Sequence, residues 1–383
     1  MADKHGRSGT LAMKVTCAVA FVLYMFCLLY FYQADMLAAA QHVLSGGLTH
    51  YDRLIGALLI TSALFLIQVG VYLLTRLERL AHAATYIPSL LLLAFIMNIS
   101  PDMDGSAGFV TWFWLVPLLL VVFTLFAWLY RKIQPYEPEY ASSGLFSRLT
   151  WSNLFVMTMM FLGVGLVAKG DDVFHYRMEM ERYLLEHDYQ SAQKVGQKSL
   201  QTDSALMMLR VYALAKAGKL GDKLFTYPLA GGSQALLPNT RSVKLMMFPE
   251  QLIYKDLGLY TKRFSTPIGY LEFIKRKHLA TQMGLDYLLT GYLLDRDLPA
   301  FVRLVMETCR SKAALPRHYR EALTLYTHMH VRPLTVYHES AMEADFQGFQ
   351  QLYHAKGNRA TRITALRDKY GDTYWYYYLS NTN

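Results

Sequence analysis

The apolar residues of this chain are concentrated in its first half, and this constrains the fold more than any other feature. Five long apolar runs lie between residues 11 and 168, whereas residues 171–383 mix charged and apolar residues as a globular chain does. A run of roughly 18 or more apolar residues is long enough to cross a bilayer as a helix. The predicted spans are residues 11–32, 54–74, 83–99, 109–130 and 151–168.

We therefore expect an all-α protein with a transmembrane domain of about five helices at residues 1–168 and a soluble domain at residues 169–383. Only 17% of the residues are charged, against about 25% in a typical soluble domain. A cleavable signal peptide is the alternative for the first run, because Ala38–Ala40 offers a small-residue cleavage motif. The run is longer than the roughly 7–15 apolar residues of a signal peptide, which favours an uncleaved anchor.

The basic residues between the predicted spans indicate the orientation in the membrane. They occupy the N-terminus and the loops after spans two and four: Lys4, Arg7, Lys14, Arg76, Arg79, Arg131, Lys132 and Arg148. The other two loops carry mainly acids: Asp35, Asp52, Asp102 and Asp104. Cytoplasmic loops are enriched in Lys and Arg, so the N-terminus is predicted to be cytoplasmic. Five crossings then place residues 169–383 outside the cytoplasm.

Residues 171–383 show apolar positions at helical spacing, which predicts a series of amphipathic helices. Residues 186–200, EHDYQSAQKVGQKSL, are similar to the turn and second helix of a tetratricopeptide repeat. In that comparison Tyr189, Ala192 and Leu200 occupy the packing positions. Helix pairs of this kind must stack on their neighbours to bury their apolar faces.

Two further segments repeat the helix–turn–helix pattern. Residues 213–225 do so near the roughly 34-residue period of the tetratricopeptide repeat, and Leu285–Cys309 gives a third pair. The segment 227–241 between them holds two Gly and two Pro residues, and we expect it to be a surface loop. Together these features predict a repeat domain resembling tetratricopeptide proteins.

The chain carries five consecutive aromatic residues, YWYYY at residues 374–378, close to its last residue. Three interpretations are open: packing that closes the last helical pair, an anchor at the membrane interface, or a stacking surface for sugars. Packing is favoured, because aromatic rings bury a large area at low entropic cost. For a binding role the candidate residues are Tyr374, Trp375 and Tyr377.

The sequence contains no motif for catalysis, a cofactor or a metal. There is no GxSxG, HExxH or Gly-rich phosphate loop, and no CxxC pair. His328 and His330 have no acid or cysteine close in sequence to complete a metal site. No ionisable residue lies in the middle of spans two to five, which argues against a pump. The net charge of +9 arises partly from loops beside the spans, so no nucleic-acid partner is predicted.

Three segments, in this order, carry a family resemblance: FYQADMLAAAQHVLSGGLTHYDRLIGALL, YALAKAGKLGDKLFTYP and YGDTYWYYYL. They resemble an uncharacterised, DUF6057-like family of multi-span membrane proteins from Bacteroidota, with a tetratricopeptide-like C-terminal region. The resemblance implies the inner membrane of a Gram-negative cell, which would make residues 169–383 periplasmic. It implies no reaction and therefore no catalytic residues.

These observations favour a non-enzymatic protein of the inner membrane that presents a periplasmic helical-repeat domain to a protein or peptide partner. Its expected partners are the lipid bilayer and a protein of the cell envelope, and no cofactor is expected. The alternative is an envelope enzyme, or a subunit of one, that acts on glycan or lipid-linked substrates. Convergence of the outward acids Asp35, Asp52, Asp102 and Asp104 on one cleft would favour that alternative.

Overall fold

The structure is a computed structural model of the chain and describes residues 2–97, 107–136, 147–168, 172–239, 242–261, 264–308, 315–355 and 358–380. These residues form eighteen α-helices, several short 3-10 segments, one π-helical turn and no β-strand. The prediction of an all-helical protein is therefore confirmed. The chain divides into two compact units, Met1–His175 and Tyr176–Asn383. The predicted domain boundary at 168/169 borders residues 169–171, which lie outside the described residues.

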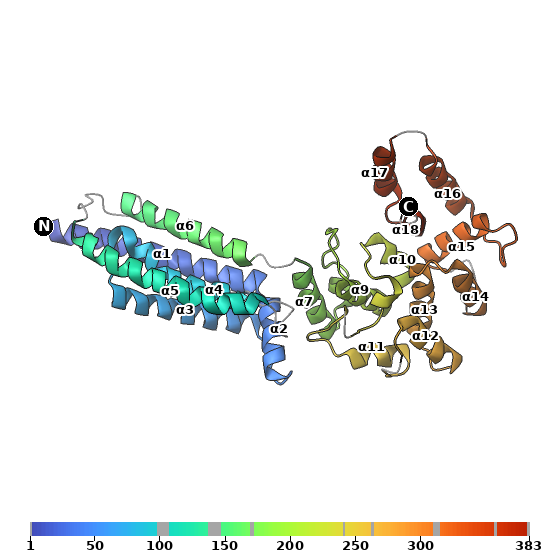
Figure 1. Cartoon of the computed structure of the whole chain (residues 1–383), viewed down its shortest axis with the longest axis horizontal. Helices are drawn as coiled ribbons and strands as arrows, with labels where there is room; N and C mark the ends of the chain where they lie inside the picture. Colours follow the sequence, from blue (N-terminus) through green and yellow to red (C-terminus); the bar gives the residue numbers. More distant parts are fainter. Residues whose placement is uncertain are drawn as a thin grey trace. The chain divides into compact units, whose positions relative to one another are not determined.

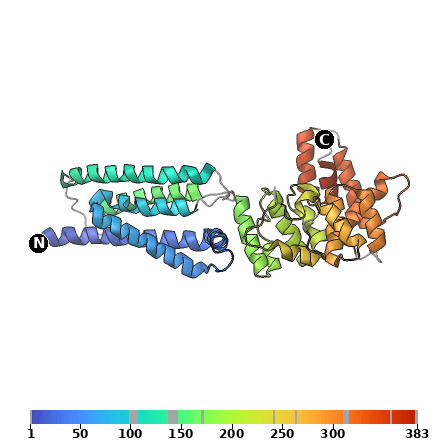
Figure 2. The same cartoon turned by 60° about the horizontal axis from the view of Figure 1, so that its bottom comes forward.

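Long helices that run side by side make up most of the first unit, as Figures 1 and 2 show from two directions. Its elements are α1 (Ala2–Cys27), η1 (Leu28–Tyr32), α2 (Ala34–Ser45), α3 (Arg53–Thr75), η2 (Arg79–Tyr86), α4 (Ile87–Met97), α5 (Ala107–Ile133), η3 (Gln134–Tyr136) and α6 (Arg148–Ala168). Their main core cluster is apolar, with Met13, Phe21, Leu64, Leu93 and Met157 among its buried side chains.

Five helices of the described chain are long and apolar enough to cross a membrane: Thr10–Tyr32, Arg53–Thr75, Arg79–Met97, Trp112–Tyr136 and Arg148–Leu166. Each overlaps one predicted span, so the prediction of five such helices is confirmed. Residues 98 and 99, the end of the predicted third span, lie outside the described residues. The third helix is the most enclosed, with 61% of its most apolar stretch buried against 11–28% for the others.

The third apolar helix begins as the 3-10 segment η2, whose irregular backbone needs partners from a neighbouring helix. Asn153 of α6 supplies them, since its Oδ1 accepts from the backbone N–H of Ala83 at 2.8 Å. Its Nδ2 donates to the carbonyl of Arg79 at 2.9 Å. In apolar surroundings each unsatisfied backbone group costs several kcal/mol, so one neutral amide makes this irregular start possible.

Helix α2 was not predicted from the sequence, which has no long apolar run there. It is capped at its C-terminus by Gly46 in the left-handed conformation (φ 60°). Within the same segment Asp35 is ion-paired with Arg53 at 3.1 Å. The carboxylate of Asp52 accepts from the N–H of Ile55 at 2.8 Å and caps the start of α3. Both acids therefore have structural partners.

Shorter helices make up the second unit (Figure 1). They are α7 (Asp172–Leu185), α8 (Tyr189–Ala192), α9 (Ser204–Lys216), α10 (Leu220–Lys223), η4 (Leu224–Thr226), η5 (Gly232–Ala235), α11 (Glu250–Leu257), α12 (Pro267–Arg276), α13 (Gln282–Leu294), α14 (Leu298–Thr308), α15 (Arg317–Met329), α16 (Ser340–Tyr353), α17 (Arg359–Tyr370) and α18 (Tyr374–Ser380). The pair α13–α14 matches the third predicted helix–turn–helix pattern, although Cys309 lies outside the described residues.

The predicted repeat helix at residues 186–200 is wrong in its second half. Regular helix ends at Ala192, and Leu200, expected at a packing position, is 81% exposed. The reason is a reversal at Gly196, which adopts φ +58°, a conformation that an α-helix cannot contain. The carbonyl of Gly196 accepts from the buried Arg210 guanidinium at 3.2 Å, which fixes the reversal.

The segment 227–241 differs from the surface loop that its Gly and Pro residues predict. Leu236 and Leu237 are buried, and so is the side chain of Tyr227. The backbone N–H of Ser233 donates to the Asp295 carboxylate at 3.2 Å. Residues 240 and 241 lie outside the described residues. The described part of this segment therefore packs inward and forms part of the core.

Candidate functional site

The aromatic tail forms helix α18, which packs among α13, α15, α16 and α17. Tyr374 and Trp375 are buried, with exposed fractions of 0% and 1%, and Tyr377 is half-buried. Tyr374, Tyr377 and Tyr378 lie on one face, with ring centroids of Tyr374 at 6.2 Å and 5.9 Å from the other two. The tail is therefore an internal element of the unit.

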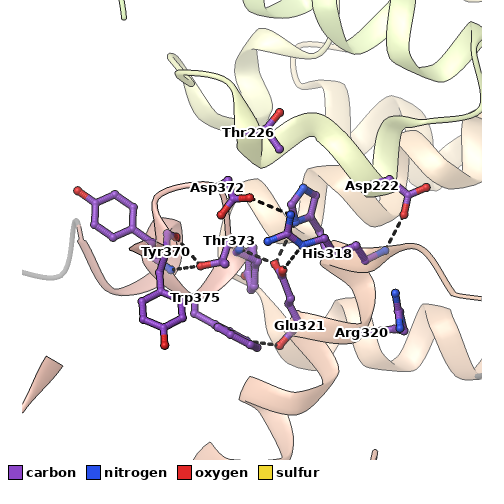
Figure 3. Close-up of polar contacts among 12 residues, drawn as sticks. Asp222, Thr226, His318, Arg320, Glu321, Tyr370, Asp372, Thr373 and Trp375 are labelled. Carbon is purple, nitrogen blue, oxygen red and sulfur yellow. Dashed lines mark hydrogen bonds and ion pairs between the residues drawn. The ribbon is translucent and has the colours of Figure 1, made fainter. Parts of the chain in front are cut away.

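Glu321, on α15, forms the central polar contacts with α18. Its buried carboxylate accepts from the backbone N–H of Tyr374 at 2.7 Å, at the N-terminus of α18. It also accepts from Arg317 Nε at 2.8 Å and contacts His318 Nδ1 at 2.9 Å. The Glu321 carbonyl accepts from Trp375 Nε1 at 2.7 Å. Figure 3 shows Glu321 between His318 and Trp375.

Arg317 extends this cluster to two other segments. Its Nη1 donates to Asp372 at 2.9 Å, just before α18. Its backbone N–H donates to the carboxylate of Asp222, on α10, at 2.7 Å. Burial alone would lower the pKa of Arg317, but the hydrogen bond to Asp372 and the charge of Glu321 raise it. A charged guanidinium therefore joins α10, α15 and the entry to the tail.

The two inward tyrosines of the tail bond to the end of α13. Tyr374 Oη donates to the carbonyl of Leu293 at 3.3 Å, and Tyr377 Oη donates to that of Leu294 at 2.7 Å. The last carbonyls of a helix have no partner within it. Burial raises the pKa of Tyr374 well above its usual value, so this hydroxyl stays protonated and able to donate.

On its other face the tail packs against α16. The ring of Trp375 lies 5.1 Å from that of Phe346 and 6.1 Å from that of Phe349. This is the arrangement that the packing interpretation describes. A binding role for Tyr374, Trp375 or Tyr377 stays a prediction, and the first two rings are not exposed to a ligand.

Beside the tail lies a cleft of about 330 Å³, which we call the tail cleft. It is lined by Phe349, Tyr353 and His354 from α16, by Arg359, Arg362, Ile363 and Leu366 from α17, and by Tyr376 and Leu379 from α18. Pockets that enclose small ligands have volumes of about 300–1,000 Å³. The tail cleft is thus large enough for one or two side chains of a partner.

The lining of the tail cleft combines flat apolar surface with positive charge. Arg362 donates to the carbonyl of Ala355 at 3.1 Å, which orients its guanidinium. The side chain of Arg359 has no hydrogen bond or ion pair within the described part of the chain. Among the described residues that line the cleft there is no carboxylate. Arginine binds carboxylates through two parallel hydrogen bonds, so the cleft suits an anionic group next to an apolar one.

Sequence reasoning identified the tail but missed the residues that line the cleft. None of Tyr376, Arg359, Arg362 and His354 was among the candidates. A signal was present, because Phe349 and Tyr353 lie four apart on one helical face. The segment RATRITALRDK, residues 359–369, follows directly and is strongly basic. What sequence could not show is that α18 lies against both helices.

Other groups singled out from the sequence have structural partners. The His328 ring packs on Phe346 at 5.1 Å, and His330 Nδ1 lies 3.0 Å from the carbonyl of Tyr326. Among the described residues no three His, Cys, Asp or Glu side chains are grouped to hold a metal ion. Asp102 and Asp104 lie outside the described residues, so convergence of the four outward acids has no structural answer here.

A family model described as a family of unknown function, DUF6057, matches the chain at residues 106–278 and 266–381. The match includes part of the first unit and nearly all of the second, including the aromatic tail and the tail cleft. No curated protein and no solved structure matches the chain.

Proposed function

The chain belongs to DUF6057, a family of unknown function, and we propose from its own geometry that it is a membrane-anchored, non-enzymatic binding protein. In this proposal the five apolar helices cross the inner membrane of a Gram-negative cell, as the resemblance to Bacteroidota proteins implies. The second unit then lies in the periplasm and presents a helical-repeat surface to a protein or peptide partner. The observation that carries the proposal is the tail cleft.

The proposed membrane location is supported by the surface of the first unit. Its long helices expose large apolar side chains, among them Leu59 at 65%, Leu66 at 69%, Val121 at 63% and Phe155 at 64%. Water-soluble proteins rarely expose contiguous apolar surface of this extent. The orientation is supported by the alternation of basic and acidic loops, because the positive charges concentrate on the cytoplasmic side.

The proposed relation to tetratricopeptide repeats is supported by the later helices of the second unit. Helices α13 and α14 are joined by a short turn in which the Asp297 carboxylate accepts from the N–H of Ala300 at 2.9 Å. Helices α15, α16 and α17 continue the series of neighbours in contact. Stacked helix pairs are typical of proteins that bind peptides on an extended surface.

The tail cleft indicates the chemistry of the partner. Three cationic or titratable side chains, His354, Arg359 and Arg362, border an aromatic floor that includes Phe349 and Tyr376. A free peptide carboxyl terminus with an apolar last residue offers the complementary groups, a carboxylate and an adjacent side chain. We propose such a terminus as the partner's contact.

The test is binding of a pooled library of short peptides to the purified full-length protein in detergent. Peptides with a free carboxyl terminus and an aromatic or aliphatic last residue are expected to be retained, and the same pool with amidated termini is not. Arg362→Gln should reduce retention about tenfold or more, since hydrogen bonds to charged groups contribute about 1.5–3 kcal/mol. Arg367→Gln, an exposed arginine of the same helix outside the cleft, is the matched control.

Two results would contradict the proposal. One is equal retention of free and amidated pools, which would remove the carboxylate from the recognised chemistry. The other is preferential retention of acidic glycans over both peptide pools, which would favour the alternative of an envelope protein that handles glycan or lipid-linked substrate. Photocrosslinking from a benzoylphenylalanine placed at Tyr376 in native membranes would then identify whether the captured molecule is a peptide or a sugar.

A further inference from the structure

A second cavity, of about 580 Å³, lies in the first unit at the ends of α3 and α5. We call it the basic cavity. Three arginines line it, Arg76 and Arg79 from the turn after α3 and Arg131 from the last turn of α5. The remaining polar lining is Gln134, Tyr72 and Glu78. The cavity lies wholly within one compact unit.

Glu78 is the one carboxylate among the described residues that line the basic cavity, and it faces Lys14 as well as the arginines, so it cannot neutralise all of them. Glu78 is 3.2 Å from Lys14 Nζ and accepts from Tyr72 Oη at 3.1 Å. Burial alone would raise the pKa of Glu78, but the hydrogen bonds from Lys14 and Tyr72 lower it, so it stays ionised beside Lys14. The described residues that line the cavity therefore carry a net positive charge.

Two of these arginines have an unusual backbone conformation. Arg76 and Arg79 both have φ of +51°, a conformation that non-glycine residues seldom adopt. Arg76 ends α3, where its N–H bonds to the carbonyl of Tyr72 at 2.8 Å. The guanidinium groups of Arg76 and Arg131 form no hydrogen bond or ion pair with any residue that the structure describes. Two guanidinium groups are thus available to a ligand.

Orientation in the membrane explains why these residues are basic, but it does not explain their convergence. The positive-inside preference requires Lys or Arg anywhere in a cytoplasmic loop. Lys132 shows the alternative, since its ammonium lies over the Trp128 ring at 3.6 Å and does not line the cavity. Three arginines around one hollow instead match the geometry of a phosphate site, because guanidinium groups bind phosphate oxygens in pairs.

The surface next to the cavity is apolar. Leu73, which lines it, is 64% exposed, and Leu74 beside it is 81% exposed. On α5, Leu129 and Ile133 are 47% and 58% exposed. A phosphate in the basic cavity would therefore have exposed hydrocarbon surface directly beside it, as the acyl chains of a phospholipid require. Free phosphate would make no use of this surface.

From this arrangement we propose that the basic cavity binds the headgroup of an anionic phospholipid, with its phosphate on Arg76, Arg79 and Arg131. Basic pockets at the cytoplasmic ends of membrane helices are suited to such headgroups. The inference rests on the proposed membrane location of the first unit. It does not depend on the tail cleft or on the partner of the second unit.

The test is native mass spectrometry of the purified full-length protein, which counts lipids retained from mixed micelles of phosphatidylglycerol and phosphatidylcholine. The wild-type protein should retain phosphatidylglycerol preferentially. Arg76→Asn and Arg131→Gln should each lower that preference by roughly fivefold, because one basic residue near an anionic lipid contributes about 1 kcal/mol. Asparagine tolerates the left-handed backbone at position 76, so this variant keeps the turn. Lys132→Gln removes the same charge outside the cavity and should leave the preference unchanged.

A second variant changes the charge in the opposite direction. Glu78→Gln removes the one acid among the described residues of the cavity, so retention of phosphatidylglycerol should rise. Equal retention of both lipids by the wild-type protein, or an equal loss in Lys132→Gln, would overturn the inference. Full displacement of the lipid by millimolar inorganic phosphate would show that the site takes a free anion instead. Failure of the protein to enter nanodiscs of either lipid would break the membrane proposal itself, whereas entry without lipid preference would break only this inference.

Discussion

The two units of the protein differ in the charge of their buried polar side chains. Among the described residues, the first unit buries no Asp, Glu, Lys or Arg side chain, and its enclosed polar groups are neutral amides and hydroxyls together with His82. The second unit buries Glu181, Arg210, His318 and Glu321, each with an exposed fraction of 2% or less. The difference follows from the length of the helices.

Long helices satisfy most of their backbone groups internally, and the polar side chains enclosed in the first unit carry no Asp, Glu, Lys or Arg charge. One amide, Asn153, is enough where its third apolar helix begins irregularly. Every helix leaves four N–H groups unpaired at its N-terminus and four C=O groups unpaired at its C-terminus, so a series of short helices leaves more of them than a few long helices do. In the second unit buried ions pair with helix-end groups, as Glu321 does at Tyr374, and with the backbone of segments between helices. The Glu181 carboxylate, for example, accepts from the backbone N–H groups of Met247 and Phe248 at 2.6 and 2.9 Å.

Such buried ions carry a cost that the hydrogen bonds must offset. Burial raises the pKa of Glu181, although the hydrogen bonds from the backbone of Met246, Met247 and Phe248 and the charge of Arg177 oppose it. The comparison thus predicts that polar substitutions inside the second unit have larger effects than those inside the first.

The largest effect is expected at the centre of the tail. Trp375→Ala removes the contacts with Phe346 and Phe349 and the hydrogen bond to Glu321. It should lower the unfolding free energy of α18 by about 3–5 kcal/mol. Hydrogen exchange of residues 374–380 in the full-length protein measures this. Trp375→Phe loses the hydrogen bond and part of the ring but keeps an aromatic contact, so it should cost less, about 1–2 kcal/mol; unchanged protection in the alanine variant would show that the tail does not close the fold.

The next largest effect concerns the buried carboxylate beneath the tail. Glu321→Gln keeps the shape but removes the charge that pairs with Arg317 and His318, so the same exchange measurement should show a loss of about 1–3 kcal/mol. Glu307→Gln is the control, because Glu307 is 58% exposed in its pair with Lys275 and such pairs contribute about 0–1 kcal/mol. Equal losses of unfolding free energy in the two variants would mean that burial of the carboxylate does not increase its contribution to stability.

In the first unit the expected effect is smaller. Asn153→Leu leaves the N–H of Ala83 and the carbonyl of Arg79 without their side-chain partner, at a cost of about 1–2 kcal/mol. Thermal unfolding in detergent can be followed by tryptophan fluorescence, since four of the five Trp residues lie in this unit. Thr158→Val, whose hydroxyl bonds only within its own helix, should leave the midpoint unchanged. A larger loss of stability in Asn153→Leu than in Glu321→Gln would contradict the expectation that polar substitutions have larger effects in the second unit.

The last expected effect, which appears only above pH 4, is a pH dependence in α13. Burial raises the pKa of Asp286 to about 6, above the value of about 3.9 in an unfolded chain. The neutral form is thus favoured by folding, and its contribution to stability is present below pH 4 and lost as the pH rises to 6. Asp286→Asn should remove up to about 2 kcal/mol of this loss. Thermal melting of the wild-type protein and of Asp286→Asn should give similar midpoints at pH 4. At pH 7 the midpoint of the variant should be the higher of the two. A lower midpoint for the variant at pH 7 would refute the assignment.

Much of the architecture was accessible from sequence because it rests on strong, local signals. Apolar runs longer than a bilayer is thick identify the five helices without any knowledge of their contacts. The pair α13–α14 followed from its helical periodicity. By contrast, the helix expected to continue through residues 193–200 is interrupted by the reversal at Gly196, which depends on the distant Arg210.

The functional site was only partly accessible for the same reason. The tail was recognisable from composition, but its cleft is made by side chains from three helices. Glu321 and Tyr374 are 53 residues apart in the chain, and no local pattern links them. Only the packed structure shows that Tyr376 faces the cleft while Trp375 lies in the core.

The central claim is that an odd number of membrane crossings places the second unit on the far side of the inner membrane. Limited proteolysis of the protein in a Gram-negative host tests it most directly, with an epitope after residue 383. The account predicts digestion of the epitope-bearing unit in intact spheroplasts and its protection in inverted membrane vesicles. Protection in spheroplasts together with digestion in inverted vesicles would contradict it.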